Sequence, residues 1–488
     1  MTKQKYNTFT LNLLATGVLL STSASTQQAT PYTIEFIQPQ QTLNIAKNLL
    51  DRDTRDTSRW SAEGSNASVV NDLGSVKTIT GTNLSTYKNS AVQYKVSESD
   101  SPNSGADSLI CIDEERLNIA KTAIEAGNPL YVAAYNALIK LADIELVKAV
   151  DPVTNKTLIA ASGDIHDYHT IGAYYWPDPT KPDGLPWVYR DGEFNRDSSG
   201  PATDWSRRKN MLKSLEILNL AFYMSGKTDY LQKVREIVQT WFVDKATRMN
   251  PNLNYGKAIP GKSDGSNFAV IDFTDIGQVI TAVQLIEKHN MWDERAKQRM
   301  QDWFSDYYTW LTTSELGIRE STRGNNHGTN YDYQALSLQL YLGKLNDANA
   351  QINVAKSRID SQIDSNGRQP AELSRTKSVN YTVNNLWAFA RITDLSRRHT
   401  SNDLWNYTRP DGVSLRTAFD FVVPYFSNPK AWKWKQITGG GVEPSFANLA
   451  LPKFTIAQLM LGVKILPSGL HGNDKLTPVE ILTYAPQF

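Results

Sequence analysis

Apolar residues recur at helical spacing through most of the chain after about residue 113. They fall at Val132, Tyr135, Leu138 and Ala142, and a similar one-sided stripe returns in the segments that follow. We expect further helices over 211–222, 231–242, 276–288, 295–312, 331–345, 348–363, 381–397, 415–426 and 454–465. Strand-like alternation is scarce here, and many helices joined by loops favour helical hairpins over a parallel sheet. The pattern therefore predicts an all-α fold.

The first 110 residues follow no helical pattern. Residues 1–29 carry Lys3 and Lys5 before a largely apolar segment and then small residues, which is typical of a cleavable signal peptide. Residues 30–110 are polar and lack a sustained period, so we expect a mostly irregular N-terminal extension and linker, followed by a helical domain over 111–488. The chain is thus predicted to be secreted or periplasmic, with no membrane span after cleavage of the signal.

Composition fits a soluble globular protein. The 488 residues are 40% hydrophobic with a formal net charge of +1, enough apolar content for a large core. The one cysteine, Cys111, excludes an intramolecular disulfide. Basic clusters are short and match no nucleic-acid-binding motif, so we expect no nucleic-acid partner. We expect a monomer.

The most informative chemistry lies in the segment 323–329. Asn326 and His327 stand side by side in a polar stretch between Gly324 and Gly328, which favours a loop before the predicted helix from Tyr331. An amide can bind the carboxylate of a sugar acid. An imidazole titrates near neutrality and can remove a proton. This segment is therefore a candidate catalytic centre.

A second polar segment supplies a guanidinium and a phenol. Arg375 and Tyr381 are six residues apart, so they would diverge on one continuous helix, but they can converge if Arg375 lies in a loop and Tyr381 in the first helical turn. Arg can hold a carboxylate in a bidentate grip. We expect the cation beside Tyr381 to favour its phenolate.

Other motifs occur in the same chain: H-D-Y at 166–168, Y-W-P-D-P at 175–179, N-L-N-Y at 252–255, N-N-H-G at 325–328 and E-L-S-R-T leading to Tyr381. With these motifs in this order, the chain resembles the alginate lyase superfamily of uronan lyases over roughly residues 115–465. The resemblance implies an α/α toroid, an incomplete barrel of helical hairpins, with a cleft across its mouth. Known alginate lyases carry a Tyr-His pair where this chain reads Tyr381-Thr382, which leaves the identity of the uronan open.

By this resemblance the catalytic residues are Asn326, His327, Arg375 and Tyr381. Asn326 and Arg375 would offset the substrate carboxylate, and Tyr381 would act as acid and, in syn elimination, also as base. His327 would help to neutralise charge or serve as the base for the opposite ring face. The segments expected to bind substrate contribute His166, Asp167, Tyr168, Trp176, Asn252, Asn254, Tyr255, Arg323, Asn325 and Glu372.

The predicted reaction is a metal-independent β-elimination that cleaves a 1,4-linked uronic-acid polymer and needs no cofactor. A metal site is not indicated, because only His166 and His169 among the six histidines are close in sequence. Two alternatives stay open. One is a glycoside hydrolase using paired carboxylates such as Asp164, Asp167 or Glu372. The other is a polysaccharide-binding protein without activity.

Overall fold

The computed structural model describes residues 32–36, 67–70, 94–98 and 108–486. The chain divides into two compact units, residues 1–104 and 105–488. The predicted signal peptide, residues 1–29, lies outside the described residues.

The described part of the first unit is a small antiparallel sheet. Its strands are β1 (Tyr32–Phe36), β2 (Ala67–Val70) and β3 (Tyr94–Glu98), in the order β2-β1-β3. Ile34 of β1 pairs with Val69 on one side and Val96 on the other. The sequence pattern does not predict these strands, because four or five residues are too few to give a sustained alternation of apolar and polar positions.

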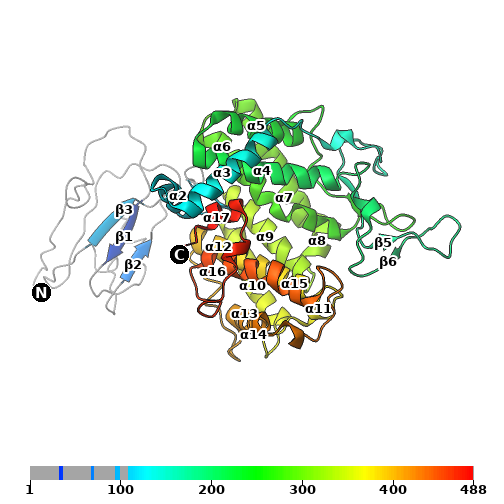
Figure 1. The fold of residues 1–488 in the computed structure, drawn as a ribbon. Helices are drawn as coiled ribbons and strands as arrows, with labels where there is room; N and C mark the ends of the chain where they lie inside the picture. Colours follow the sequence, from blue (N-terminus) through cyan, green and yellow to red (C-terminus); the bar gives the residue numbers. More distant parts are fainter. Residues whose placement is uncertain (1–31, 37–66, 71–93, 99–107, 487–488) are drawn as a thin grey trace, which may run out of the picture. The chain divides into compact units, whose positions relative to one another are not determined.

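The second unit is helical (Figure 1). Nearly every helix predicted from the apolar stripes is present, with bounds that differ by a few residues at each end. The α-helices are α2 (Glu114–Glu125), α3 (Pro129–Leu146), α4 (Trp205–Ser225), α5 (Thr228–Val238), α6 (Gly277–Lys288), α7 (Glu294–Thr313), α8 (Glu315–Ser321), α9 (Asn326–Tyr341), α10 (Leu345–Gln362), α11 (Pro370–Leu373), α12 (Ser378–His399), α13 (Leu415–Val422), α14 (Pro424–Ser427), α15 (Val442–Ser445), α16 (Leu451–Leu461) and α17 (Pro478–Tyr484). Shorter helical turns are η3 (Val153–Asn155), η4 (Arg196–Ser199), η6 (Asn267–Ile276), η7 (Pro429–Ala431) and η9 (Asn473–Lys475), and η5 (Gln239–Val243) and η8 (Phe446–Ala450) are π-helical.

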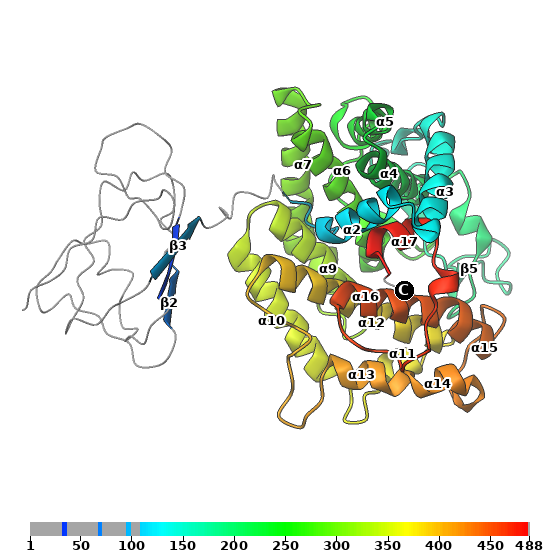
Figure 2. The same cartoon turned by 60° about the vertical axis from the view of Figure 1, so that its left-hand side comes forward.

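The helices form two layers around a ring. Helices α4, α6, α9, α12 and α16 each contact the next, and α17 contacts both α16 and α4, which closes the inner layer. Helices α3 and α5 pack outside α4, α7 and α10 pack against α9, and α13 packs against α12 (Figure 2). The predicted α/α toroid of helical hairpins is confirmed.

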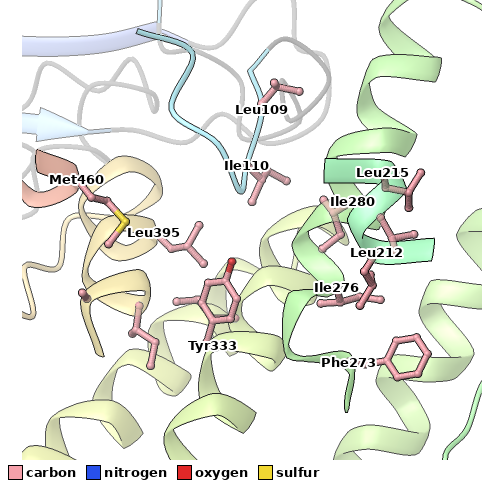
Figure 3. Packing of buried hydrophobic residues seen from close by; sticks show 14 of the residues in the cluster. Leu109, Ile110, Leu212, Leu215, Phe273, Ile276, Ile280, Tyr333, Leu395 and Met460 are labelled. Atoms are coloured by element: carbon pink, nitrogen blue, oxygen red, sulfur yellow. The ribbon is translucent and has the colours of Figure 1, made fainter. Parts of the chain in front are cut away.

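The inner helices are buried on more than one side, so their apolar faces are wider than a single stripe. Helix α9 is buried along almost its whole length, and Leu212 and Leu215 of α4 pack near Ile276 and Ile280 (Figure 3). The continuous segment Asn267–Lys288 is the one described helical stretch long and apolar enough to cross a membrane, but 83% of its apolar window is buried. It is a core helix of the toroid.

Long connections between the helices carry short strands. Strand β4 (His169–Ile171) pairs in parallel with β7 (Tyr255–Ala258), and β5 (Tyr175–Trp176) pairs with β6 (Val188–Tyr189) as an antiparallel hairpin. The H-D-Y, Y-W-P-D-P and N-L-N-Y motifs therefore meet at one pair of small sheets. These connections lie beside the N-terminal ends of α9 and α12, where the candidate site forms.

Candidate active site

Residues from several distant segments line one cleft with a volume of about 780 Å³. The cleft brings together the four predicted catalytic residues, Asn326, His327, Arg375 and Tyr381, and also the predicted substrate-binding residues Arg323 and Asn325. Its remaining lining residues are Gly172, Ala173, Tyr174, Tyr175, Tyr189, Asp191, Phe194, Trp205, Lys257, Ser266, Phe268, Ile271 and Asn384.

Asn326 is the first residue of α9, so the predicted loop is correct at Asn325 and wrong for Asn326 and His327. The side chain of Asn325 caps the helix by accepting the N–H of His327 at 3.2 Å. The buried carboxylate of Glu372 accepts both the backbone N–H of Asn326, at 2.5 Å, and its Nδ2, at 2.7 Å. Two helix-terminal N–H groups are thereby satisfied, and α9 begins five residues earlier than the apolar pattern indicated.

Glu372 therefore positions Asn326 and is not among the residues that line the cleft. The family resemblance predicts instead that it binds substrate directly. Its side chain is fully buried at the end of the short helix α11. Burial raises the pKa of Glu372 above its ordinary value, although hydrogen bonds from Asn326 oppose the shift. The carboxylate fixes the orientation of the Asn326 amide.

His327 is oriented by a second buried carboxylate. Its Nδ1 lies 2.5 Å from Oε1 of Glu320, which is fully buried and also accepts Nδ2 of Asn267 at 2.6 Å. With a carboxylate as acceptor, Nδ1 carries the hydrogen and Nε2 is the other nitrogen of the imidazole. Phe268 packs edge-on against the ring at 5.2 Å. Sequence analysis did not single out Glu320, although its position seven residues before His327 was visible.

Arg375 and Tyr381 converge as predicted. Arg375 lies in the loop between α11 and α12, and Tyr381 is the fourth residue of α12. The guanidinium stacks on the Tyr381 ring at 4.0 Å and donates from Nη2 to the phenol oxygen at 3.0 Å. The same phenol donates to the hydroxyl of Tyr174 at 2.9 Å.

Arg375 favours the phenolate of Tyr381 as expected, but other influences on the pKa of this phenol outweigh it. Burial is the largest influence on the pKa of Tyr381 and raises it. Contact with Tyr174 raises this pKa further, and the lowering effect of Arg375 is smaller. The Arg375 charge is also shared, because Nε and Nη2 donate to the carboxylate of Asp191 at 3.0 and 2.5 Å. Tyr381 is therefore a neutral phenol in the free enzyme.

Asp191 is the site residue whose role the sequence did not reveal. It follows β6 and accepts hydrogen bonds from Arg375, from the N–H and hydroxyl of Thr376 and from Tyr189. Burial alone would raise the pKa of Asp191, but these hydrogen bonds outweigh it and hold the pKa well below the usual range. Gly192 has a φ of +76° and leaves no room for a Cβ beside Thr376, so a glycine is needed for this approach.

Lys257 adds another cation to the cleft. It lies in β7, two residues after the last residue of the N-L-N-Y motif, with a left-handed φ of +52° that is uncommon outside glycine. Its ammonium pairs with Asp272 at 3.0 Å, and the same carboxylate lies 3.6 Å from Arg208. Neither the conformation nor this partner could be read from the sequence.

The predicted substrate-binding residues of the H-D-Y motif are not among the residues that line the cleft. The imidazole of His166 bonds to a backbone carbonyl, and the carboxylate of Asp167 accepts Nδ2 of Asn250 at 2.8 Å. Tyr168 is fully buried, with its hydroxyl on Asp272 at 3.1 Å. In the structure this motif anchors the loops that carry the cleft.

The predicted binding residues Trp176, Asn252, Asn254 and Tyr255 are also not among the residues that line the cleft. Asn252 accepts the N–H of Asn254, whose own side chain accepts Nε1 of Trp310 at 2.8 Å. Tyr255 pairs in β7, and the Trp176 indole donates to a backbone carbonyl at 3.1 Å. Of the loop aromatics, Tyr174, Tyr175 and Tyr189 line the cleft. A direct role of the other segments in binding substrate stays a prediction.

Known proteins resemble this chain in sequence and in fold. The family model of alginate lyase matches residues 152–432, more than half of the chain. The crystal structure of an alginate lyase from Bacteroides ovatus is 32% identical, with a TM-score of 0.69 over 77% of this chain and 98% of that chain. Alginate lyase A1-III from Sphingomonas species A1 is 14% identical, with a TM-score of 0.45 over 71% of this chain and 94% of that chain. No curated protein matches the sequence. The chain belongs to the alginate lyase family and is a polysaccharide lyase.

Proposed function

We propose that this lyase cleaves a 1,4-linked uronan, with alginate the first candidate, by β-elimination in the cleft. The observation that carries the proposal is the shared cleft itself. Asn326 and His327 from the start of α9 line it together with Arg375 and Tyr381 from the loop and first turn of α12. The printed name of the similar Bacteroides ovatus protein supports alginate as the polymer to test first.

The reaction removes the proton on C5 of a uronate, next to its carboxylate, and charge accumulates on that group. Arg375 can offset this charge, because its Nη1 has no hydrogen-bond partner among the described residues. One Nδ2 hydrogen of Asn326 is used by Glu372, and the other can be donated to the substrate. Preorganised donors of this kind typically stabilise the transition state by about 3 kcal/mol each. With these donors in place we propose that no metal is required.

Two groups are available for proton transfer. The raised pKa of Tyr381 keeps the phenol protonated, which suits donation to the O4 leaving group. Glu320 holds Nδ1 of His327, so Nε2 is the nitrogen that can accept the C5 proton. This division of roles fits a uronate whose C5 proton faces His327. For the opposite ring face, Tyr381 would have to serve as both base and acid.

A hydrolytic mechanism would need two carboxyl groups flanking the bond. Asp191 is the one carboxylate among the described cleft residues, and Arg375 binds it. Asp164 and Asp167 accept hydrogen bonds from Asn250. The arrangement around the cleft therefore favours elimination over hydrolysis.

The direct test is to incubate the purified enzyme with alginate, polymannuronate, polyguluronate and glucuronan and to follow ultraviolet absorbance. Elimination leaves a conjugated double bond at the new non-reducing end, so absorbance should rise with at least one polymer. New reducing ends without absorbance would indicate hydrolysis. Binding without either product would indicate an inactive binding protein.

We also propose that residues 1–29 direct export and are then removed. Lys3 and Lys5 followed by the apolar segment support this. Determining the N-terminus of protein recovered from the medium or periplasm tests it. Retention of Met1 on protein confined to the cytoplasm would contradict the proposal.

A further inference from the structure

A shallow depression adjoins the cleft at the turn between α8 and α9. It has a volume of about 310 Å³ and is lined by Arg319, Thr322, Arg323, Gly324, Asn325 and Ala371. Arg323 and Asn325 also line the catalytic cleft, so the two hollows adjoin at these residues. The groove therefore extends beyond the four candidate catalytic residues.

The extension is positively charged and has no internal counter-charge. Arg319 and Arg323 are both exposed, and neither forms an ion pair with any residue that the structure describes. Glu320, between them in sequence, is turned inward onto His327. Glu315, four residues before Arg319, is not within ion-pair distance of it, although this spacing is the favourable one on a helix. Both guanidinium groups border the same depression, so an anion bound there would meet positive charge from two side chains.

The two cations occupy different positions relative to α8. Arg319 is in the last turn of α8, where a positive charge is stabilised by the helix C-terminus. Arg323 lies two residues beyond the end of α8. Its guanidinium is held over the ring of Phe268, at 5.4 Å, and Phe268 in turn packs against His327. Arg323 thus connects the depression physically to the catalytic imidazole.

We propose that Arg319 and Arg323 form a distal subsite that binds the carboxylates of uronate residues beyond the pair being cleaved. This inference rests on the proposed function. A uronan carries one carboxylate on every sugar, and a guanidinium binds a carboxylate with paired hydrogen bonds. The hollow is shallow and open, which suits a chain that leaves the cleft. The enzyme would therefore gain affinity from a long polymer that a short oligosaccharide cannot supply.

The test measures binding separately from turnover. Alginate oligosaccharides, one trimeric and one decameric, are titrated calorimetrically into the Tyr381→Phe enzyme with and without Arg319→Gln. We expect Arg319→Gln to weaken decamer binding by about three- to tenfold and trimer binding by less than about twofold. Arg319→Lys should restore part of the loss, because it keeps the charge but not the fork. Arg295→Gln, an exposed arginine on α7, is the matched control and should change neither affinity.

Salt dependence provides a second readout. Decamer affinity should fall less steeply with added NaCl in Arg319→Gln than in its parent, because one charge contact is missing. Equal losses for trimer and decamer, or no loss for either, would overturn the distal subsite while leaving the lyase proposal intact if alginate still gives ultraviolet-absorbing products. Failure of both oligosaccharides to bind the parent enzyme, with no product from alginate, would overturn both proposals for this polymer.

Discussion

The carboxylate of Glu320 lies 2.5 Å from Nδ1 of His327, inside the toroid and out of contact with solvent. The pair resembles a carboxylate–imidazole dyad in which the acid fixes the tautomer and orientation of the base. Because Asn267 donates to the other carboxylate oxygen, at 2.6 Å, the position of Glu320 is itself fixed. The proposed base is therefore held by two buried partners.

Substituting Glu320 by Gln should lower kcat while leaving KM nearly unchanged. The amide of the substituted side chain can donate a hydrogen bond to Nδ1 of His327. This favours the tautomer that carries its hydrogen on Nε2, and a protonated Nε2 cannot accept the C5 proton. We expect a loss of about 10² to 10⁴ in kcat, by analogy with other imidazoles whose orienting carboxylate is removed. Steady-state kinetics with the cleaved uronan measure it. Glu315→Gln on the same helix is the control, and equal kcat values for the two variants would exclude this role of Glu320.

Glu372→Ala should destabilise the fold and reduce activity together. The substitution leaves the first N–H of α9 and the Asn326 amide without their acceptor in a buried position. Losing hydrogen bonds to a charged group should lower the free energy of unfolding by about 2 to 3 kcal/mol. Denaturant unfolding measures the change. A free energy of unfolding equal to that of wild type would mean that water or another group replaces the carboxylate.

Asp191→Asn should destabilise the protein most at neutral pH and progressively less as the pH falls below about 4. The folded protein holds the pKa of Asp191 below its unfolded value of about 4. A depressed acid pKa contributes stability that is present above the unfolded pKa and lost as pH falls through the folded pKa. The difference between wild type and Asp191→Asn should therefore be largest at pH 6–7 and shrink below about pH 4. Denaturant unfolding at several pH values tests this.

Asp306→Asn, an exposed carboxylate on α7, is the matched control and should show no such pH dependence. A difference between wild type and Asp191→Asn that stays constant from pH 7 to pH 3 would show that the Asp191 contacts do not depend on its charge.

Removing divalent cations should leave turnover unchanged. In our account Arg375 and Asn326 supply the donors that a metal would otherwise provide. Dialysis against a chelator, followed by the absorbance assay, should give a rate within about twofold of the untreated enzyme. Loss of activity that Ca²⁺ or Mg²⁺ restores would contradict a metal-independent mechanism.

The fold could be predicted from the sequence largely because each helix carries an apolar stripe of its own. The first residue of α9 could not be predicted in this way, because Asn325, Asn326 and Gly328 are polar or small and give no apolar stripe. The start of this helix depends on Glu372, which is distant in sequence. The strands β1 to β3 were missed because they are short and far apart. A local pattern of apolar residues does not show which residues far apart in the sequence will be in contact.

The sequence predicted which functional groups form the candidate site, but not their ion pairs or the directions of their pKa shifts. The convergence of Arg375 and Tyr381 followed from their spacing and from helix geometry. The raised pKa of Tyr381 could not be inferred from the sequence, because it depends on burial and on contact with Tyr174, which lies next to the β5–β6 hairpin. The sequence did not assign a role to Asp191 for the same reason, since Arg375 and Thr376, which donate to it, lie 184 and 185 residues further along the chain.

The most direct measurement is the rate of ultraviolet-absorbing product formation by Tyr381→Phe. Removing this one hydroxyl should lower kcat by at least about 10³-fold, because the leaving group loses its acid, while uronan binding measured by calorimetry should stay within about threefold of wild type. Tyr223→Phe, whose hydroxyl bonds to Asn118 away from the cleft, should keep full activity. Near-normal turnover by Tyr381→Phe would contradict the central role of this phenol.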